Sequence, residues 1–405
     1  MPNNSLSKNL ASALVGGGLL VLLLSCGLPM GIVIGLRGVQ NAVNEEFRDL
    51  ASDISGMDAE SEPSDVDQRV QLLLDEANEY VSRGDNKTAV SVQSEALEID
   101  PQSYIALLSR AISYRNMGRY DEALADANVA IALKPGDALG YQVRAEVWNF
   151  LGEWDRAIED ADKAIALDPT HPGTYFERGL AHHQQGVLTA AIEDYSAAIS
   201  LRPDDSCFLH LRGQAYNENG QNELALADYD SVVRLEPTRP DLYYHRGNAR
   251  YGLGQYDEAI KEYGEAIKRD PMNAHAYSNR GAMWEEEQEY SNAIADFRAA
   301  LDVDPDNHFA LRNLANALAT YPDGELRNGK EAIRLALKAN EFTSVPKCEL
   351  LETLACAYAE DGQFEQAMKL QAAALDAAPE EDKEDYRDRL NLFNDGHPYR
   401  MSVDE

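Results

Sequence analysis

The chain of 405 residues has little cysteine and little positive charge. Its four cysteines, Cys26, Cys207, Cys348 and Cys356, are too few for a disulfide scaffold and form no Cys-x-x-Cys pair for zinc. The 36 basic residues against 70 acidic ones give a formal charge of −34, which repels nucleic-acid phosphates and anionic membrane surfaces. We therefore expect no nucleic acid among the partners.

Motifs that support catalysis or bind cofactors are also missing. No Ser-His-Asp order, His-Glu-x-x-His, Walker loop or dinucleotide fingerprint occurs in the chain. The eight histidines are scattered, and neighbours such as His182 and His183 would point to different sides of a helix. The sequence therefore predicts no enzyme activity, no metal site, no cofactor and no small-molecule substrate.

One long apolar run lies near the N-terminus, after a short tail of residues 1–9. Residues 10–36 read LASALVGGGLLVLLLSCGLPMGIVIGL without a charge, and a helix rising about 1.5 Å per residue would exceed a hydrocarbon core of about 30 Å. A cleaved signal normally has an apolar run of only roughly 7 to 15 residues. We expect a retained transmembrane helix, with the part of the chain that follows it outside the cytoplasm.

A second interpretation of this segment stays open. Residues 23–27, LLSCG, resemble a bacterial lipobox, in which cleavage leaves the cysteine, here Cys26, as an acylated N-terminus. Residues 37–69 follow as an acidic juxtamembrane linker. Nine acidic residues and one basic residue between Glu45 and Asp67, with interspersed Ser, Gly and Pro, are typical of a solvated spacer.

A period of 34 residues dominates the rest of the chain. Prolines recur at this spacing from Pro101 to Pro305, and numbering each repeat so that proline is position 32 makes Val70 the first residue of seven regular repeats, 70–307. Positions 8, 20 and 27 are small in almost every repeat, and position 15 is glycine in the first six. Small residues let two antiparallel helices cross closely, glycine ends the first helix and proline stops the second.

A 34-residue helix-turn-helix of this pattern resembles the tetratricopeptide repeat (TPR), also in its frequent aromatic residue at position 24. Ala127 and Ala161 depart from the pattern at that position. The resemblance implies an all-α, right-handed α-solenoid of about nine helix pairs. An eighth repeat with an insertion would occupy 308–347, a ninth 348–381, and a capping helix and tail 382–405. The last repeats and the closing HPYR are similar to a C-terminal module of membrane-anchored bacterial TPR proteins.

Charged residues of opposite sign recur in step at positions 7 and 23. We interpret them as ion pairs that tie adjacent helices, although an arginine ladder for a partner is an alternative. The arginines at position 7 are Arg110, Arg144, Arg178, Arg212, Arg246 and Arg280, and the acidic residues at position 23 are Asp126, Asp160, Asp194, Asp228, Glu262 and Asp296.

The resemblance also implies a ligand surface, here called the inner face, at positions 2, 5, 9 and 12 of each first helix. In the central repeats these positions hold aromatic and amide side chains suited to a peptide. The candidate residues are Phe176, Leu180, His183, His210, Gln214, Asn217, Tyr244, Asn248 and Tyr251. The lysines and arginines with which some TPR adaptors clamp a C-terminal carboxylate are absent from the corresponding positions, although Arg312 and Asn316 retain half of such a pair.

These patterns predict a membrane-anchored scaffold whose partners are other proteins, bound as peptides or domains in the concave TPR groove. A structural component of an envelope, secretion or pilus assembly, acylated at Cys26, is the alternative.

Overall fold

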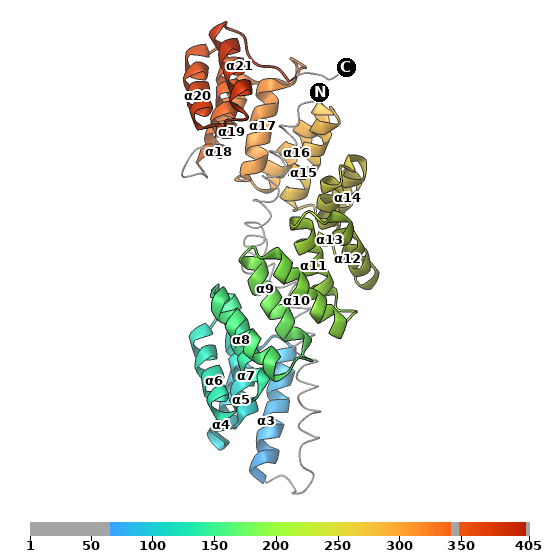
Figure 1. Ribbon diagram of the computed structural model, residues 1–405, viewed down its shortest axis with the longest axis vertical. Coiled ribbons are helices and arrows are strands. Elements are labelled where there is room, and N and C mark those ends of the chain that lie inside the picture. The colour runs from blue at the N-terminus through green and yellow to red at the C-terminus, as the bar shows by residue number, and fades with distance from the viewer. Residues whose placement is uncertain (1–64, 342–347, 402–405) are drawn as a thin grey trace. The chain divides into compact units, whose positions relative to one another are not determined.

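The computed structural model describes residues 65–341 and 348–401 (Figure 1). These residues form nineteen α-helices and no strand, in agreement with the all-α prediction. The apolar run 10–36 with Cys26, and residues 37–64 of the linker, lie outside the described residues. Within the described ranges, no helix combines the length and the hydropathy needed to cross a membrane.

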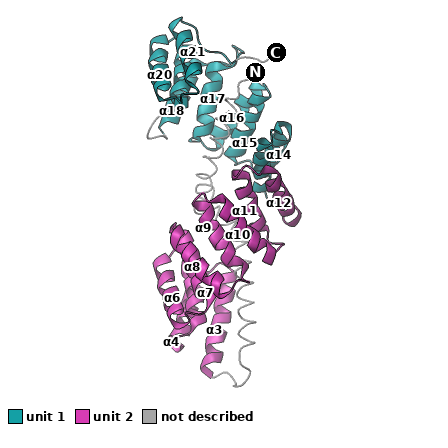
Figure 2. Cartoon of the chain, viewed as in Figure 1, with its two compact units in different colours: residues 1–9, 238–405 teal, residues 10–237 magenta. Residues whose placement is uncertain are grey.

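The chain divides into two compact units, which are coloured separately in Figure 2. The described part of unit 2 is 65–237 and contains five helix pairs. Within the unit, each helix packs against its neighbours along the chain. The helices are α3 (Asp65–Ser82), α4 (Asn86–Ile99), α5 (Tyr104–Asn116), α6 (Tyr120–Leu133), α7 (Ala138–Leu151), α8 (Trp154–Leu167), α9 (Pro172–Gln184), α10 (Leu188–Leu201), α11 (Ser206–Glu218) and α12 (Asn222–Leu235).

The described part of unit 1 begins at Thr238 and contains four helix pairs and a closing helix. The last helix, α21, packs on α20 and buries Tyr386 and Phe393, as a capping element should. The helices are α13 (Asp241–Gly252), α14 (Tyr256–Arg269), α15 (Ala274–Glu286), α16 (Tyr290–Val303), α17 (His308–Thr320), α18 (Gly329–Asn340), α19 (Cys348–Glu360), α20 (Phe364–Ala377) and α21 (Lys383–Asn394).

The first described helix starts earlier than the repeat numbering suggests. Helix α3 begins at Asp65, five residues before Val70, so the end of the stretch assigned to the linker is helical. Asp65 and Asp67 lie in its first turn, where negative charge interacts favourably with the positive end of the helix dipole. The acidic residues at the end of the predicted spacer therefore also favour the start of helix α3.

The turns follow the glycine and proline pattern. Gly118 and Gly152 adopt φ values of 72° and 74°, in the left-handed region that glycine enters without steric cost. In the seventh repeat Gln288 takes this place with φ of 59°. The second helices end two residues before the repeated prolines, because proline disfavours helix in the residue before it.

The core of each repeat is a close helix crossing. Ala111, Ala123 and Ala130, at positions 8, 20 and 27 of the second repeat, are fully buried, so the two helices approach closely at these positions.

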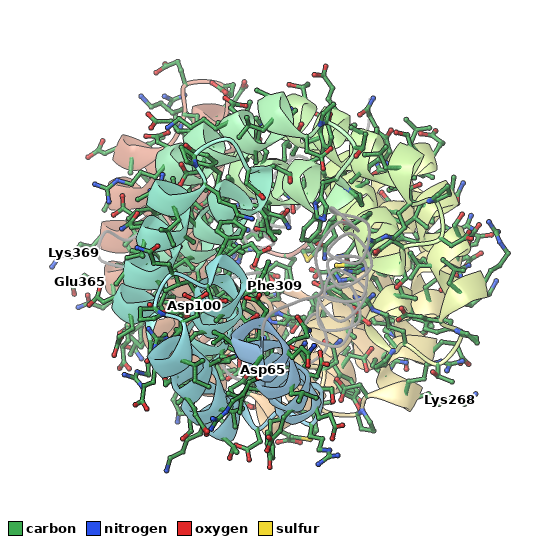
Figure 3. All side chains as sticks on the ribbon, turned by 90° about the horizontal axis from the view of Figure 1, so that it is seen from below. Asp65, Asp100, Lys268, Phe309, Glu365 and Lys369 are labelled. Carbon is green, nitrogen blue, oxygen red and sulfur yellow. The ribbon has the colours of Figure 1, made fainter. Side chains whose placement is uncertain are left out.

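The three described cysteines form no disulfide with one another, and burial raises the pKa of Cys356 to about 12. Charged side chains such as Lys268, shown in Figure 3, project away from the helices into solvent.

Positions 8 and 24 touch across this crossing, and their sizes are matched. In the fourth to seventh repeats, glycine at position 8 faces a fully buried aromatic ring at position 24. A Cβ atom added to Gly247 would lie 2.5 Å from Cε1 of Tyr263. In the second and third repeats, where position 24 is Ala127 and Ala161, position 8 is alanine instead. The two departures from the TPR pattern are therefore compensated within their own repeats.

This size matching predicts opposite effects for two glycine substitutions in the sixth repeat. Gly247→Ala forces the new methyl group against the Tyr263 ring and should destabilise unit 1 by about 1–3 kcal/mol. Gly264→Ala is the control, because its Cβ would meet only Nη1 of Arg280, at 3.5 Å. It should stabilise helix α14 by about 0.5–1 kcal/mol. Urea unfolding followed by circular dichroism measures both, and an equal response of the two variants would contradict the size rule.

Candidate functional site

The six arginines at position 7 are all engaged in ion pairs. Each contacts the acidic residue sixteen positions later, at position 23 of its own repeat, with N–O distances of 2.6–2.9 Å. Apart from Glu262, these acidic side chains are no more than 10% exposed. The structure thus brings together all the residues interpreted as structural ion pairs.

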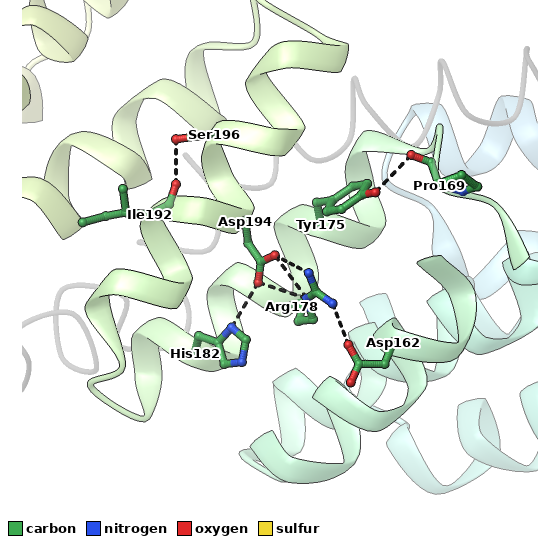
Figure 4. Close-up of polar contacts among 8 residues, drawn as sticks. All are labelled: Asp162, Pro169, Tyr175, Arg178, His182, Ile192, Asp194 and Ser196. Atoms are coloured by element: carbon green, nitrogen blue, oxygen red, sulfur yellow. Dashed lines mark hydrogen bonds and ion pairs between the residues drawn. The ribbon is translucent and has the colours of Figure 1, made fainter. Parts of the chain in front are cut away.

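Several of these arginines also reach the preceding repeat. Figure 4 shows Arg178 joined to Asp194 of its own repeat and, through Nη1, to Asp162 of the repeat before, with an N–O distance of 2.6 Å in each case. His182 adds a contact to the Asp194 carboxylate at 3.0 Å. Position 25 is the acceptor in three further repeats, as Ser94, Asn128 and Ser196. The arginines therefore couple successive repeats, which leaves the partner-binding alternative without support.

The inner face of unit 2 is more tightly packed than its residue types suggest. Phe176 is 7% exposed, and its ring centroid lies 5.1 Å from that of Phe208. His183 is 1% exposed and lies between Glu218, at 3.1 Å, and the Tyr195 hydroxyl, at 3.4 Å.

His210 and Gln214 are also buried, so four of the six residues proposed in this unit fill space between helices. Leu180 and Asn217 remain partly exposed. The repeat position gave the correct side of the helix but not the exposure, because side chains of the following helices cover this side.

In unit 1, Tyr244, Asn248 and Tyr251 all keep some exposure on helix α13. The Asn248 side chain is nevertheless held in place. Its Oδ1 accepts hydrogen bonds from the Tyr263 hydroxyl at 2.8 Å and from Asn279 Nδ2 at 3.0 Å. Burial raises the pKa of Tyr244, and hydrogen bonds with Asn248 and Asn279 oppose that shift. Asn248 therefore has a structural role in addition to any contact with a partner.

The sequence analysis did not predict two further ring-bearing side chains on the inner face of unit 1. His275 and Phe309 occupy position 2 of the seventh and eighth repeats and are both partly exposed. The His275 ring lies 6.5 Å from that of Tyr244. Burial lowers the pKa of His275, so this imidazole favours its neutral form. Position 2 of the repeat is the sequence signal that marks both residues.

Charged residues also lie on this face, on helices α15, α17 and α19. Burial and the neighbouring Glu286 carboxylate raise the pKa of Glu285 to about 8. Burial lowers the pKa of Arg312, and the carboxylates of Glu349 and Glu285 oppose that change. Arg312 therefore lies between acidic side chains, which makes it a poor half of a clamp for a carboxylate ligand.

Comparison with known proteins now assigns the family. Profiles of the tetratricopeptide repeat match residues 74–138, 151–215, 244–308 and 349–381, and a further TPR profile matches 213–254. The chain is a tetratricopeptide-repeat protein. A comparison with curated proteins gives no match.

Solved structures are also similar to this TPR protein. The Cut9–Hcn1 hetero-tetramer of the APC/C is 16% identical, covers 73% of this chain and 57% of its own, and has a TM-score of 0.52. YrrB, described as a TPR protein with an unusual peptide-binding site, is 23% identical over 46% of this chain and 95% of its own, with a TM-score of 0.41. A TPR protein from Parabacteroides merdae is 19% identical over 61% and 98%, with a TM-score of 0.45.

TPR arrays are interaction scaffolds, and their stacked first helices offer an extended surface to a protein partner. The repeats of this TPR protein therefore indicate a protein–protein interaction scaffold. In unit 1 that surface holds the aromatic residues and the charged cluster described above.

The raised pKa of Glu285 predicts how the stability of this TPR protein depends on pH. The folded state keeps a proton on Glu285 up to about pH 8, whereas the unfolded chain releases it near the ordinary value of 4.5. Stability from this group is therefore present below pH 4.5 and is lost as the pH rises to about 8. Burial and the Glu286 carboxylate raise the pKa, whereas Arg312 and the hydrogen bond with Tyr321 oppose that shift. Glu285→Gln should raise the melting temperature at pH 9 and change it little at pH 4.5.

The exposed Glu289 supplies the control for this experiment, since Glu289→Gln removes the same charge nearby without burial. Thermal melts at both pH values compare the two variants. An equal shift for both at pH 9 would mean that net charge, and not the burial of Glu285, sets the response.

Proposed function

We propose that this TPR protein is a membrane-anchored scaffold that binds a peptide or domain of a partner protein on the inner face of its first helices. The observation that carries this proposal is the set of partly exposed rings on unit 1. Tyr244 and Tyr251 of α13, His275 of α15 and Phe309 of α17 belong to this set. They occupy positions 2, 5 and 12, which share one side of a helix.

These rings are suited to anchoring a peptide because they are already fixed. The Tyr251 ring lies 5.9 Å from that of Tyr256, and Tyr244 contacts the Tyr263 ring at 6.1 Å. Aromatic side chains supply large contact areas, and an anchor held before binding loses little conformational entropy when a partner arrives. The candidate residues of unit 2 are mostly buried, so unit 2 contributes less to partner binding in this proposal.

The membrane anchor in this proposal rests on the sequence. Residues 10–36 form an uncharged apolar run long enough for a bilayer, and the acidic residues that follow would keep the repeats in solvent. We assign the repeats to the outside of the cytoplasm. Anchoring raises the local concentration of the scaffold at one surface, which suits recruitment of a partner to that surface.

The anchor predicts the behaviour of the intact chain in cell fractionation. It should stay with membranes through high-salt and alkaline washing, whereas a chain that begins at Asp65 should be soluble and helical. Mass spectrometry of the mature N-terminus distinguishes a retained helix from a diacylated Cys26. Full-length protein in the soluble fraction would remove the anchor from the proposal.

The inner face predicts which substitutions weaken partner capture. Tyr251→Ala and Phe309→Ala each remove a partly exposed ring, and a central aromatic anchor typically contributes about 2 kcal/mol, or about thirtyfold in affinity. Crosslinking capture from native membranes, quantified by mass spectrometry, measures the loss.

Leu337→Ala is the matched control, because Leu337 is 46% exposed on α18, a second helix. Capture that depends on Leu337 and not on Tyr251 or Phe309 would move the partner to the second-helix side and favour the envelope-assembly role.

A further inference from the structure

The last turn of helix α17 is completed by residues that come later in the chain. A helix leaves its last four carbonyl groups without partners of its own, and a proline two residues after α17 prevents the helix from continuing. The Leu318 carbonyl accepts a hydrogen bond from the N–H of Asn328, the N-cap of α18, at 2.8 Å. The next two carbonyls are bound by residues 396–401, here called the closing segment.

The closing segment follows helix α21 and forms no helix itself. Gly396, with φ of 73°, lies just beyond the end of α21, where a left-handed glycine can cap a helix. The N–H of Met401 donates to the Thr320 carbonyl at 2.9 Å, and Nη1 of Arg400 donates to the Ala319 carbonyl at 3.3 Å. The closing segment therefore binds the end of a helix that lies 81 positions earlier in the chain.

One carboxylate, that of Glu360, joins the closing segment to the insertion between α17 and α18. Its Oε1 pairs with Nε of Arg327 at 3.1 Å, and its Oε2 pairs with Nη2 of Arg400. Arg327 also donates to the carbonyls of Tyr321 and Pro322, at 2.8 and 2.7 Å. Glu360 is the last residue of α19, where the helix dipole disfavours negative charge. The two arginines therefore offset a charge that the helix alone would destabilise.

The other side chains of the closing segment make aromatic and apolar contacts. The guanidinium of Arg389, on α21, lies over the Tyr399 ring, 4.5 Å from its centroid, which is a cation–π arrangement. Tyr399 and Met401 also pack against the buried core that includes Leu314 and Leu354. The segment is thus held by a main-chain hydrogen bond, a paired arginine and an aromatic anchor. These are the contacts by which a peptide ligand is commonly bound.

We propose that the end of α17, together with Glu360 and Arg389, is a binding site for an extended peptide in which arginine follows an aromatic residue. The closing segment is the ligand of this site within the same chain. Because a short tether gives a ligand an effective concentration on the order of 1 mM, the closing segment keeps the site filled. A partner peptide of the same chemistry gains access when the closing segment is released.

This peptide site is separate from the rings proposed to bind a partner on the inner face. Phe309 lies in the first turn of α17, whereas Thr320 is its last residue. Eleven residues of helix separate them by about 16 Å. The two sites can therefore be tested independently.

A labelled peptide tests whether the site accepts a ligand from outside the chain. The probe is fluorescein-labelled GHPYRM, the sequence of residues 396–401. Its twin has citrulline, which is similar in shape but uncharged, in place of arginine. Fluorescence anisotropy on the purified full chain measures both affinities. Arg400→Ala should bind the probe at least about tenfold more tightly than the unchanged chain, because the tethered competitor is weakened and Glu360 is free to pair with the arginine of the probe.

Arg387→Ala is the matched control. Arg387 is exposed on α21, so its loss changes the net charge by the same amount as the loss of Arg400. This control should bind the probe like the unchanged chain, within about twofold. Equal gains in the two variants would overturn the proposal, since a chain with a charge of −34 attracts basic peptides in general. Equal binding of the probe and its citrulline twin to Arg400→Ala, or no binding of either, would overturn it as well.

Two further variants separate ligand binding from a loss of folding, which circular dichroism melts monitor. Glu360→Gln added to Arg400→Ala removes the acceptor for the arginine of the probe and should cancel at least about tenfold of the gain. Arg400→Lys keeps the charge but not the planar fork of the guanidinium, so its probe affinity should lie between those of the unchanged chain and Arg400→Ala. If the double variant were folded and bound the probe as tightly as Arg400→Ala, Glu360 would not be part of the site and the proposal would fail.

Discussion

The contact between positions 8 and 24 is the constraint on which each repeat depends. It sets the distance between the two helices of a pair. It also allows a large side chain at only one of the two positions. Where the ring is present, as at Tyr195 or Tyr263, the facing residue is glycine, because a Cβ atom would lie within 3 Å of the ring. Because protein interiors are close-packed and have few voids, an added atom at this contact would force the two helices or the ring to move. The arginine pairs then link one helix pair to the next and fix how successive repeats stack.

The same rings connect the core to the inner face. The hydroxyl of Tyr263 holds Asn248, and that of Tyr195 lies 3.4 Å from His183, so a core residue orients a residue on the binding side. A buried phenol needs such a partner because an unmatched hydroxyl is costly. Some inner-face side chains therefore serve as hydrogen-bond partners of buried tyrosine hydroxyls. Partner contacts are left to side chains that the core does not use, such as Tyr251 and Phe309.

The sequence predicted the repeats and the pairing of positions 7 and 23, because both depend on neighbours at fixed spacing. It predicted the binding side chains less well. Whether Phe176 or His210 is exposed depends on residues one repeat away, and these differ between repeats. The cluster of Glu285, Arg312 and Glu349 was invisible for the same reason. Its members come from three repeats and three different positions, so no single recurring position marks them in the sequence.

Burial also gives the acidic composition two different effects. Exposed carboxylates, such as Glu365, are screened by salt over about 10 Å and act on a partner mainly before contact, by attracting basic surfaces. Glu285 behaves differently, because burial raises its pKa to about 8 and the carboxyl group therefore keeps its proton at neutral pH and interacts mainly through its hydrogen bond with Tyr321. A basic segment would therefore be drawn to the chain by its exposed carboxylates, and the partly exposed rings of the inner face would supply its contact area.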